Sequence, residues 1–260
     1  MQNEHVQHLN EAIGENLSKI STMTASAASG NIEISEDLTL WKETFILQDE
    51  FNKVVNSNWR EANSNWPRAI RGEVLEAIDS YNWEWWKKKK NTPNHMNAEV
   101  ELVDTFFFLI SHSLTFVKSE RDFTNLCNTT FTLVFAKEQQ VVQNQTDVKF
   151  NQEEFIKLGE DIIKFSLVNP EQYQLMFLRL MDMWLSLGLK VIDLMKLYRT
   201  KHILNLFRQQ NGYKEGTYIK IWGEEEDNVI CWQLAKRLPM DEMLQTNLLE
   251  ELNNAYANFK

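Results

Sequence analysis

The 260-residue chain is long enough to bury a sizeable core, but its 8 glycines and 4 prolines provide too few turns for a many-stranded β sandwich. We therefore expect an all-α fold, a helical bundle built from long helices with few breaks. The formal net charge of -10 argues against general nucleic-acid binding, because a phosphate backbone is bound mainly by clustered Lys and Arg. The same acidic excess suits a site that collects divalent cations.

The N-terminal extension, residues 1–36, is rich in Ser, Ala, Asn and Glu; we expect it to be partly disordered and assign it no function. Residues 37–260 are predicted to form a single all-α domain. Its first helix extends from Asp37 to Asn58, because apolar side chains recur there at helical intervals and Ser35 or Asp37 can cap the N-terminus.

The second and third helices are predicted to form a hairpin. The second begins near Ser64, since Pro67 suits a first helical turn, and it extends past Trp83. Residues 91–97 contain a Thr-Pro-Asn sequence that interrupts the helical pattern, and the third helix then covers residues 98–117. Two helices joined by such a short connection are expected to pack antiparallel.

The rest of the chain is predicted to be mainly helical, with one long loop. Further helices are expected at residues 151–168, 171–187, 190–209 and 239–259. Residues 128–149 remain ambiguous, since the run Phe131–Phe135 fits either a strand or a buried helix. A mobile loop with three glycines and two tyrosines is expected at about residues 210–229.

Two cysteines, Cys127 and Cys231, are too few for a disulfide framework and lack metal-ligand spacing, which indicates a reducing, cytoplasmic location. The N-terminus lacks the basic and then apolar order of a signal peptide. The longest apolar stretch, residues 102–117, is short and carries Asp104 and His112. We therefore expect neither a membrane span nor a membrane partner.

The third predicted helix has a narrow polar stripe within an otherwise apolar surface. Successive residues placed about 100° apart bring into one sector the side chains of Glu101, Asp104, Thr105, Ser111, His112 and Thr115. A solvated helix face is normally broad and carries Lys or Arg, whereas this stripe carries no cation. Its acids are therefore predicted to face an internal site.

The second predicted helix supplies a matching pair of acids. Glu73 and Glu76 are three residues apart and lie on adjacent turns of one face, so they can oppose Glu101 and Asp104 across the hairpin. Four acids in an apolar setting would repel one another unless a cation neutralised them. Oxygen-only ligands favour hard ions, chiefly Mg²⁺, and neither pair has the Glu-x-x-His pattern of di-iron bundles. A non-catalytic helical interaction protein with surface acids remains the alternative.

Several segments together resemble the dimeric dUTPase branch of the all-α nucleotide pyrophosphohydrolase superfamily. The similar segments cover roughly residues 40–120 and 170–232, and comprise Leu47–Asn52, Glu73–Ser80, Trp83–Lys87, Asn97, Glu101–Asp104, Lys201–Gln209, Gly212–Lys220 and Glu226–Asn228. The sequence departs from this branch at Phe106–Phe108, where the branch often has an aromatic residue and His.

The resemblance implies an all-α, magnesium-dependent dUTP diphosphatase that forms a homodimer. It implies hydrolysis of dUTP to dUMP and pyrophosphate by attack of water at the β-phosphate, with more than one Mg²⁺ taking part. It further implies that dUDP is accepted and that the activity limits uracil in DNA. A pyrophosphohydrolase for dCTP or for assorted nucleotides is the nearest alternative.

The resemblance also assigns roles to individual residues. The metal ligands would be Glu73, Glu76, Glu101 and Asp104. Glu76 is the first candidate to orient or deprotonate the attacking water, and Glu73 is the second. Uracil would be recognised by Gln48, Asn52 and Trp83 or Trp86, the base or sugar by Asn205, and Asn97 matches a further substrate-binding position. The phosphates would be bound by Lys201, Arg208, Lys214 and Lys220, and Tyr213 and Asn228 would act as the loop closes.

The region from Tyr173 to Leu197 carries Leu and Met on several helical faces. Such a surface exceeds what one hairpin needs to cover, and we interpret the surplus as a homodimer interface.

Overall fold

The computed structural model describes residues 33–88, 93–143, 149–239 and 243–259. The expectation of partial disorder for residues 1–36 therefore falls almost entirely outside the described residues. In chain order the elements are α2 (Glu33–Val55), α3 (Trp66–Asp79), α4 (His95–Leu114), α5 (Glu120–Gln143), α6 (Gln152–Val168), α7 (Tyr173–Ser186), α8 (Val191–Gln210), β1 (Ile221–Trp222), β2 (Glu225–Glu226), α9 (Asp227–Ala235) and α10 (Leu244–Ala257). The all-α fold class is confirmed, and the two-residue strands form the one sheet of the described part.

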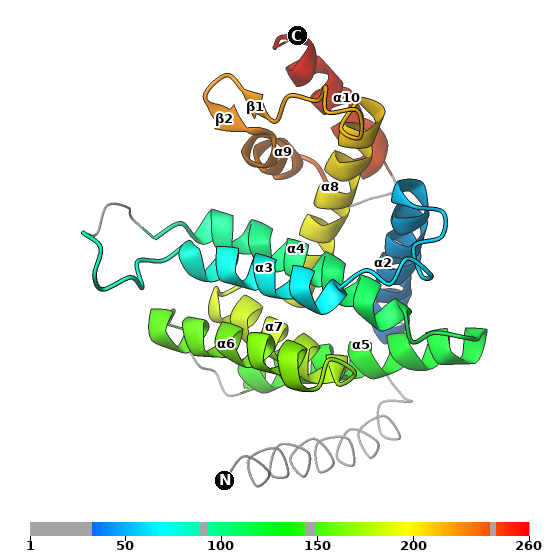
Figure 1. Ribbon diagram of the computed structural model, residues 1–260, viewed down its shortest axis with the longest axis vertical. Helices are drawn as coiled ribbons and strands as arrows, with labels where there is room; N and C mark the ends of the chain where they lie inside the picture. Colours follow the sequence, from blue (N-terminus) through cyan, green and yellow to red (C-terminus); the bar gives the residue numbers. More distant parts are fainter. Residues whose placement is uncertain (1–32, 89–92, 144–148, 240–242, 260) are drawn as a thin grey trace, which may run out of the picture.

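The hairpin of α3 and α4 crosses the centre of the molecule (Figure 1). Helix α6 packs against α3, and α7 packs against α4. Each helix of the hairpin begins with an asparagine cap. Asn65 accepts a hydrogen bond from the backbone N–H of Arg68 at 3.0 Å, with Pro67 in the first turn, and Asn94 accepts one from Asn97 at 3.0 Å. The predicted hairpin is thus present.

Helix α3 ends at Asp79, so the prediction that it extends past Trp83 is wrong. The carbonyl of Ser80 accepts a hydrogen bond from the backbone N–H of Asn94 at 3.0 Å, which ties the end of α3 to the start of α4. The Ser80 carbonyl therefore forms a hydrogen bond across the connection between the two helices. Helix α4 begins at His95, three residues before the expected start, because Asn94 caps it.

The ambiguous segment at residues 128–149 is helical as far as residue 143, where α5 ends, and residues 144–148 lie outside the described part. Buried side chains recur along α5 at helical spacing, namely Leu126, Cys127, Thr130, Phe131, Leu133 and Val134. The run that also fitted a strand therefore lies within an amphipathic helix, where Phe131, Leu133 and Val134 are buried and Phe135 is half-buried.

The apolar surplus between Tyr173 and Leu197 lies inside the subunit, so the surface argument for a dimer interface there is wrong. The segment forms two helices, α7 and the start of α8, and α7 alone buries Leu175, Met176, Phe177, Leu180, Met181, Met183, Trp184 and Leu185. These side chains pack into the main core against α4, α5 and α6.

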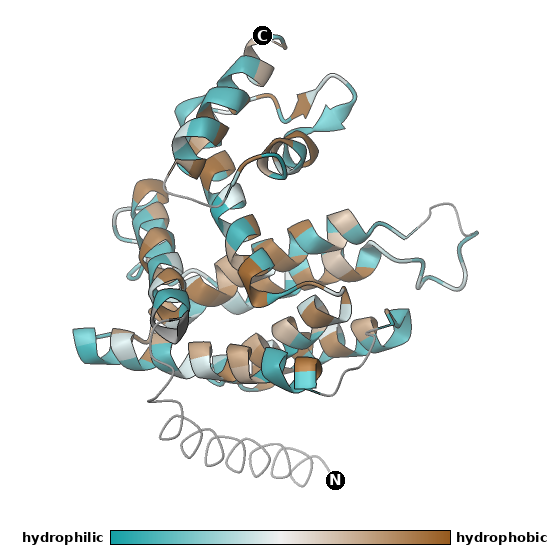
Figure 2. Ribbon diagram, turned by 180° about the vertical axis from the view of Figure 1, so that it is seen from behind, coloured by the Kyte–Doolittle hydropathy of each residue, from teal (hydrophilic) through white to brown (hydrophobic). Residues whose placement is uncertain are grey.

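The buried apolar side chains form two clusters, and α8 contributes to both. The main cluster includes Tyr198 and the side chains of α2 to α7, whereas the C-terminal cluster begins with Ile203 and includes β1, α9 and α10. Apolar and polar residues alternate along these helices (Figure 2). This pattern is typical of helices that pack an apolar face against a core. Within the described residues, no helix combines the length and apolar content needed to cross a bilayer.

The segment predicted as a loop at about 210–229 is more structured than expected. Ile221 pairs with Glu226 and Trp222 with Glu225 in an antiparallel hairpin, and α9, which the sequence did not predict, begins at Asp227. The last predicted helix is observed as α10 from Leu244, with residues 240–242 outside the described part.

Gly159 allows α6 to pack closely on α3, the helix that carries Glu73. A Cβ atom at Gly159 would lie 2.9 Å from Cδ1 of Ile78 and 3.2 Å from Cγ1 of Val74, whereas a Cβ at the exposed Gly72 would meet nothing within 4 Å. Both substitutions to Ala gain helix propensity, but only Gly159→Ala overpacks the interface.

We therefore expect Gly159→Ala to be less stable than Gly72→Ala by about 1–3 kcal/mol, the usual cost of overpacking. Urea unfolding of the two variants and the wild type measures this difference, and Gly72→Ala should exceed the wild type by about 0.5–1 kcal/mol. Equal stability of the two variants would contradict the close packing of α6 on α3.

Candidate active site

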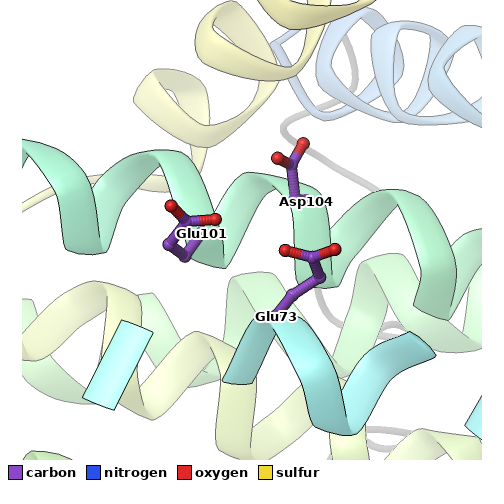
Figure 3. Close-up of side chains that lie close together, drawn as sticks. All are labelled: Glu73, Glu101 and Asp104. Carbon is purple, nitrogen blue, oxygen red and sulfur yellow. The ribbon is translucent and has the colours of Figure 1, made fainter. Parts of the chain in front are cut away.

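Three carboxylates converge between α3 and α4. One oxygen from each of Glu73, Glu101 and Asp104 lies within 4.8 Å of the others, and each side chain is partly exposed. Glu101 and Asp104 are three residues apart on one face of α4, and Glu73 faces them from α3 (Figure 3). The structure thus brings together three of the four predicted acids.

Glu76, the fourth predicted acid, is exposed at the edge of this group. Its oxygens are not part of the close cluster, but its charge contributes to raising the pKa values of both Glu73 and Glu101. Glu76 therefore belongs to the same electrostatic neighbourhood, with its carboxylate open to solvent.

Glu73 and Glu101 hold their protons more tightly than ordinary carboxylates do. Burial, followed by the charges of Asp104 and Glu76, raises the pKa of Glu73 to about 8. Burial and the charge of Asp104 raise the pKa of Glu101 to about 7. A set of clustered oxygen donors whose negative charges repel one another fits a hard divalent cation, which would relieve that repulsion.

Lys201 connects this cluster to the C-terminal part of the chain. Its Nζ donates to Oδ2 of Asp104 at 2.7 Å and to Oδ1 of Asn228 at 3.0 Å, and its side chain is only 3% exposed. A buried ammonium needs such a partner, since an unpaired buried charge is costly. Lys201 therefore holds α8 and α9 against the acidic hairpin.

Arg208 is held by a bidentate ion pair with Asp227, the first residue of α9. Its Nε and Nη2 atoms donate to the two carboxylate oxygens of Asp227 at 2.8 and 2.7 Å, and Tyr218 donates to the same carboxylate at 2.7 Å. Asp227 is fully buried. No role was predicted for Asp227, although it lies within the segment Glu226–Asn228 that resembles the family.

Arg208 also reaches two of the predicted substrate-binding amides. It donates to Oδ1 of Asn228 at 3.0 Å and to Oδ1 of Asn205 at 3.3 Å. Asn228 therefore accepts from both Lys201 and Arg208. The cations and amides form one preorganised network along α8.

One cavity of about 560 Å³ joins the acids, amides and cations. The predicted site residues in its lining are Gln48, Asn52, Glu73, Asp104, Lys201, Asn205, Arg208, Tyr213 and Lys220. The predicted site residues outside its lining are Glu76, Trp83, Trp86, Asn97, Glu101, Lys214 and Asn228. Glu101 and Asn228 nevertheless contact lining residues, through the acidic cluster and through Lys201 and Arg208.

The tryptophans that line the cavity are not those expected from the sequence. Trp59 and Trp66, whose rings meet edge to face with centroids 5.9 Å apart, form part of its wall. Trp83 and Trp86 follow the C-terminal end of α3 and are 37% and 54% exposed, whereas Trp66 is at its N-terminal end. The sequence did not single out Trp66, although its place just before Pro67 marked a helix start.

Asn97 and Lys214 have different surroundings. Asn97 donates to the Ser80 hydroxyl at 3.0 Å and so joins the adjacent ends of α3 and α4, and Lys214 is exposed. Lys220 lies 5.5 Å from the centroid of the Tyr213 ring at the cavity wall.

An all-α fold in which one cavity gathers clustered carboxylates, amides and cations has the side chains needed to bind and hydrolyse a nucleotide. Comparison with protein families agrees, because a family model described as dUTPase matches residues 40–213, more than half of the chain. The chain belongs to the dUTPase family, which makes it a hydrolase acting on nucleoside triphosphates. No curated protein matches it significantly.

The raised pKa values make the stability of the metal-free protein depend on pH. Above pH 4.5 the unfolded chain loses protons that folded Glu73 and Glu101 retain up to about pH 8 and about pH 7. The free energy of unfolding contributed by these groups therefore falls as the pH rises through this window. Glu73→Gln removes the larger of the two contributions.

We expect urea unfolding in the presence of a chelator to show a shallower fall in stability for Glu73→Gln than for the wild type between about pH 5 and about pH 8. Comparison with the variant removes the contribution of other titrating groups. An equally steep fall in both proteins would contradict the proton retention of Glu73.

Proposed function

We propose that this protein is a dUTP diphosphatase, which hydrolyses dUTP to dUMP and pyrophosphate, also accepts dUDP, and limits uracil in DNA. The observation that carries this proposal is that Glu73 and Asp104 line the same cavity as the amides of α2 and the cations of α8. Membership of the dUTPase family supports it.

Magnesium ions would be held by Glu73, Glu101 and Asp104, with Glu76 as the fourth ligand. The close carboxylate oxygens and the raised pKa values of Glu73 and Glu101 support this assignment. When bound, more than one Mg²⁺ would supply positive charge to the phosphate oxygens. Glu76, whose carboxylate is open to solvent, would accept the proton of the attacking water, with Glu73 as the second candidate.

The phosphates would be bound by cations on one face of α8 and on the following segment. Lys201 and Arg208 line the cavity and are fixed by Asp104 and Asp227, which lowers the entropic cost of ordering them around an anion. Lys220 would complete this part of the site with Tyr213, and the exposed Lys214 would join it when the segment closes.

The base would lie between the amides of α2 and an aromatic wall. Gln48 and Asn52 are almost fully buried and line the cavity, and Trp66 is better placed to pack on a base than Trp83 or Trp86. Asn205 would reach the base or the sugar. Asn97 is retained only as a support of the hairpin, given its bond to Ser80.

A panel of deoxynucleoside triphosphates with Mg²⁺ tests the activity, with product formation followed by chromatography. We expect dUTP to be the preferred substrate and Glu76→Gln to lose at least about 100-fold in turnover, the usual contribution of a general base. Nucleotide binding by Glu76→Gln should remain measurable.

Glu160→Gln, an exposed change on α6, is the matched control and should keep wild-type turnover. A preference for dCTP, or equal use of all nucleotides, would replace the proposed substrate. Full activity of Glu76→Gln would refute its role as the base.

We also propose that the protein is a cytoplasmic homodimer. Both cysteines are buried free thiols, which suits a reducing compartment. On α2 the side chains of Ile46 and Val54 are large, apolar and exposed, and they offer surface for a second subunit. Light scattering at micromolar concentration should give twice the mass of 30.7 kDa, and a monomer mass would exclude the dimer.

A further inference from the structure

A closed hydrogen-bond network fixes the two amides that line the cavity. It joins Gln48 and Asn52 of α2 to Ser111 of α4 and to Tyr198 of α8. Ser111 and Tyr198 are fully buried and do not line the cavity. They therefore act on anything in the cavity through the amides.

The hydroxyl of Ser111 decides which way the amides face. Its one hydrogen is donated to the backbone carbonyl of Phe107 at 2.9 Å, and a carbonyl can only accept. The Ser111 oxygen is then an acceptor for both amides, from Nε2 of Gln48 at 3.0 Å and Nδ2 of Asn52 at 2.9 Å. Both NH₂ groups must point towards Ser111.

Tyr198 secures the other end of Gln48. Its hydroxyl donates to Oε1 of Gln48 at 3.0 Å, the position that the orientation set by Ser111 leaves for an acceptor. The Tyr198 ring stacks on Phe107 with centroids 4.3 Å apart and an interplanar angle of 26°, so the hydroxyl is held in place. Burial raises the pKa of Tyr198, which keeps the hydroxyl protonated as a donor.

These contacts leave Asn52 with a defined pair of groups for a ligand. Gln48 uses both of its N–H groups, one on Ser111 and one on Oδ1 of Asn52 at 3.0 Å. Within the described residues, Asn52 keeps one N–H and one lone pair on Oδ1. A reversed Gln48 would turn Oε1 towards the lone pairs of Ser111 and leave the Tyr198 hydroxyl without its acceptor, so the order of this donor and acceptor is fixed.

The order matters because uracil and cytosine present opposite groups at adjacent ring positions. Position 3 of uracil donates and position 4 accepts, whereas position 3 of cytosine accepts and position 4 donates. An amide held in one orientation can match one of these patterns, and matches the other only after it is reversed.

We infer that Tyr198 and Ser111 are positioning residues that set the preference for uracil over cytosine by preventing the amides of Gln48 and Asn52 from reversing. This inference rests on the proposed function, because it presumes that a pyrimidine nucleotide occupies the cavity. Neither residue touches the base; each acts through the α2 amides.

Calorimetric titration of nonhydrolysable analogues of dUTP and dCTP into the wild type, Tyr198→Phe and Ser111→Ala tests the inference. We expect the ratio of the two Kd values to move towards one by at least about fivefold in each variant, the scale of one net hydrogen bond. Tyr81→Phe is the matched control, because it also removes a buried hydroxyl, bonded to Nδ1 of His95 at 3.1 Å, without touching the network. It should keep the wild-type ratio.

If Tyr198 and Ser111 had a merely structural role, their replacement would weaken the binding of both analogues equally and leave the ratio of the two Kd values unchanged. That result would overturn the inference. A wild type that binds both analogues equally would also overturn it. If Tyr198→Phe does not fold, Ser111→Ala decides alone. A wild type that binds the dUTP analogue selectively but hydrolyses no nucleotide would refute the proposed function. The ratios of the two Kd values in the variants would still test the inference.

Discussion

Repulsion among the carboxylates of α3 and α4 is the constraint that the surrounding structure has to satisfy. Three acids share a partly buried space, and one buried ammonium, that of Lys201, bonds directly to the cluster through Asp104. Lys201 compensates the cluster only in part, as the raised pKa values of Glu73 and Glu101 indicate. The fold therefore retains an acidic centre that is ready for additional positive charge.

The acidic hairpin could be predicted from the sequence because it depends on residues that are close together in the chain. Spacings of three residues place Glu73 beside Glu76 and Glu101 beside Asp104, and a short connection brings the two helices together. The end of α3 could not be predicted, because it depends on the bond between Ser80 and Asn94 across the connection. Helical periodicity contains no information about such a contact.

The aromatic wall and the amide network could not be predicted, for a different reason. Trp59 reaches the cavity because its indole N–H bonds to Asp49 on α2 at 3.1 Å, a contact that turns the segment between α2 and α3 back on the bundle. Tyr198 is 150 residues from Gln48 in the chain, and Ser111 is 63 residues away. Residue types and spacings identify candidates for a site, but they do not identify the distant side chains that orient them.

Helix α8 runs without interruption from the main cluster of buried side chains into the C-terminal cluster. Lys201 and Arg208 are seven residues apart on it, about two turns or roughly 10 Å along the axis, so both point to the same side. Adding or deleting one residue between them would rotate Arg208 by about 100° and separate it from Asp227 and the cavity. None of the residues between them is exposed, so the core constrains the side chains of this stretch and the site constrains its length.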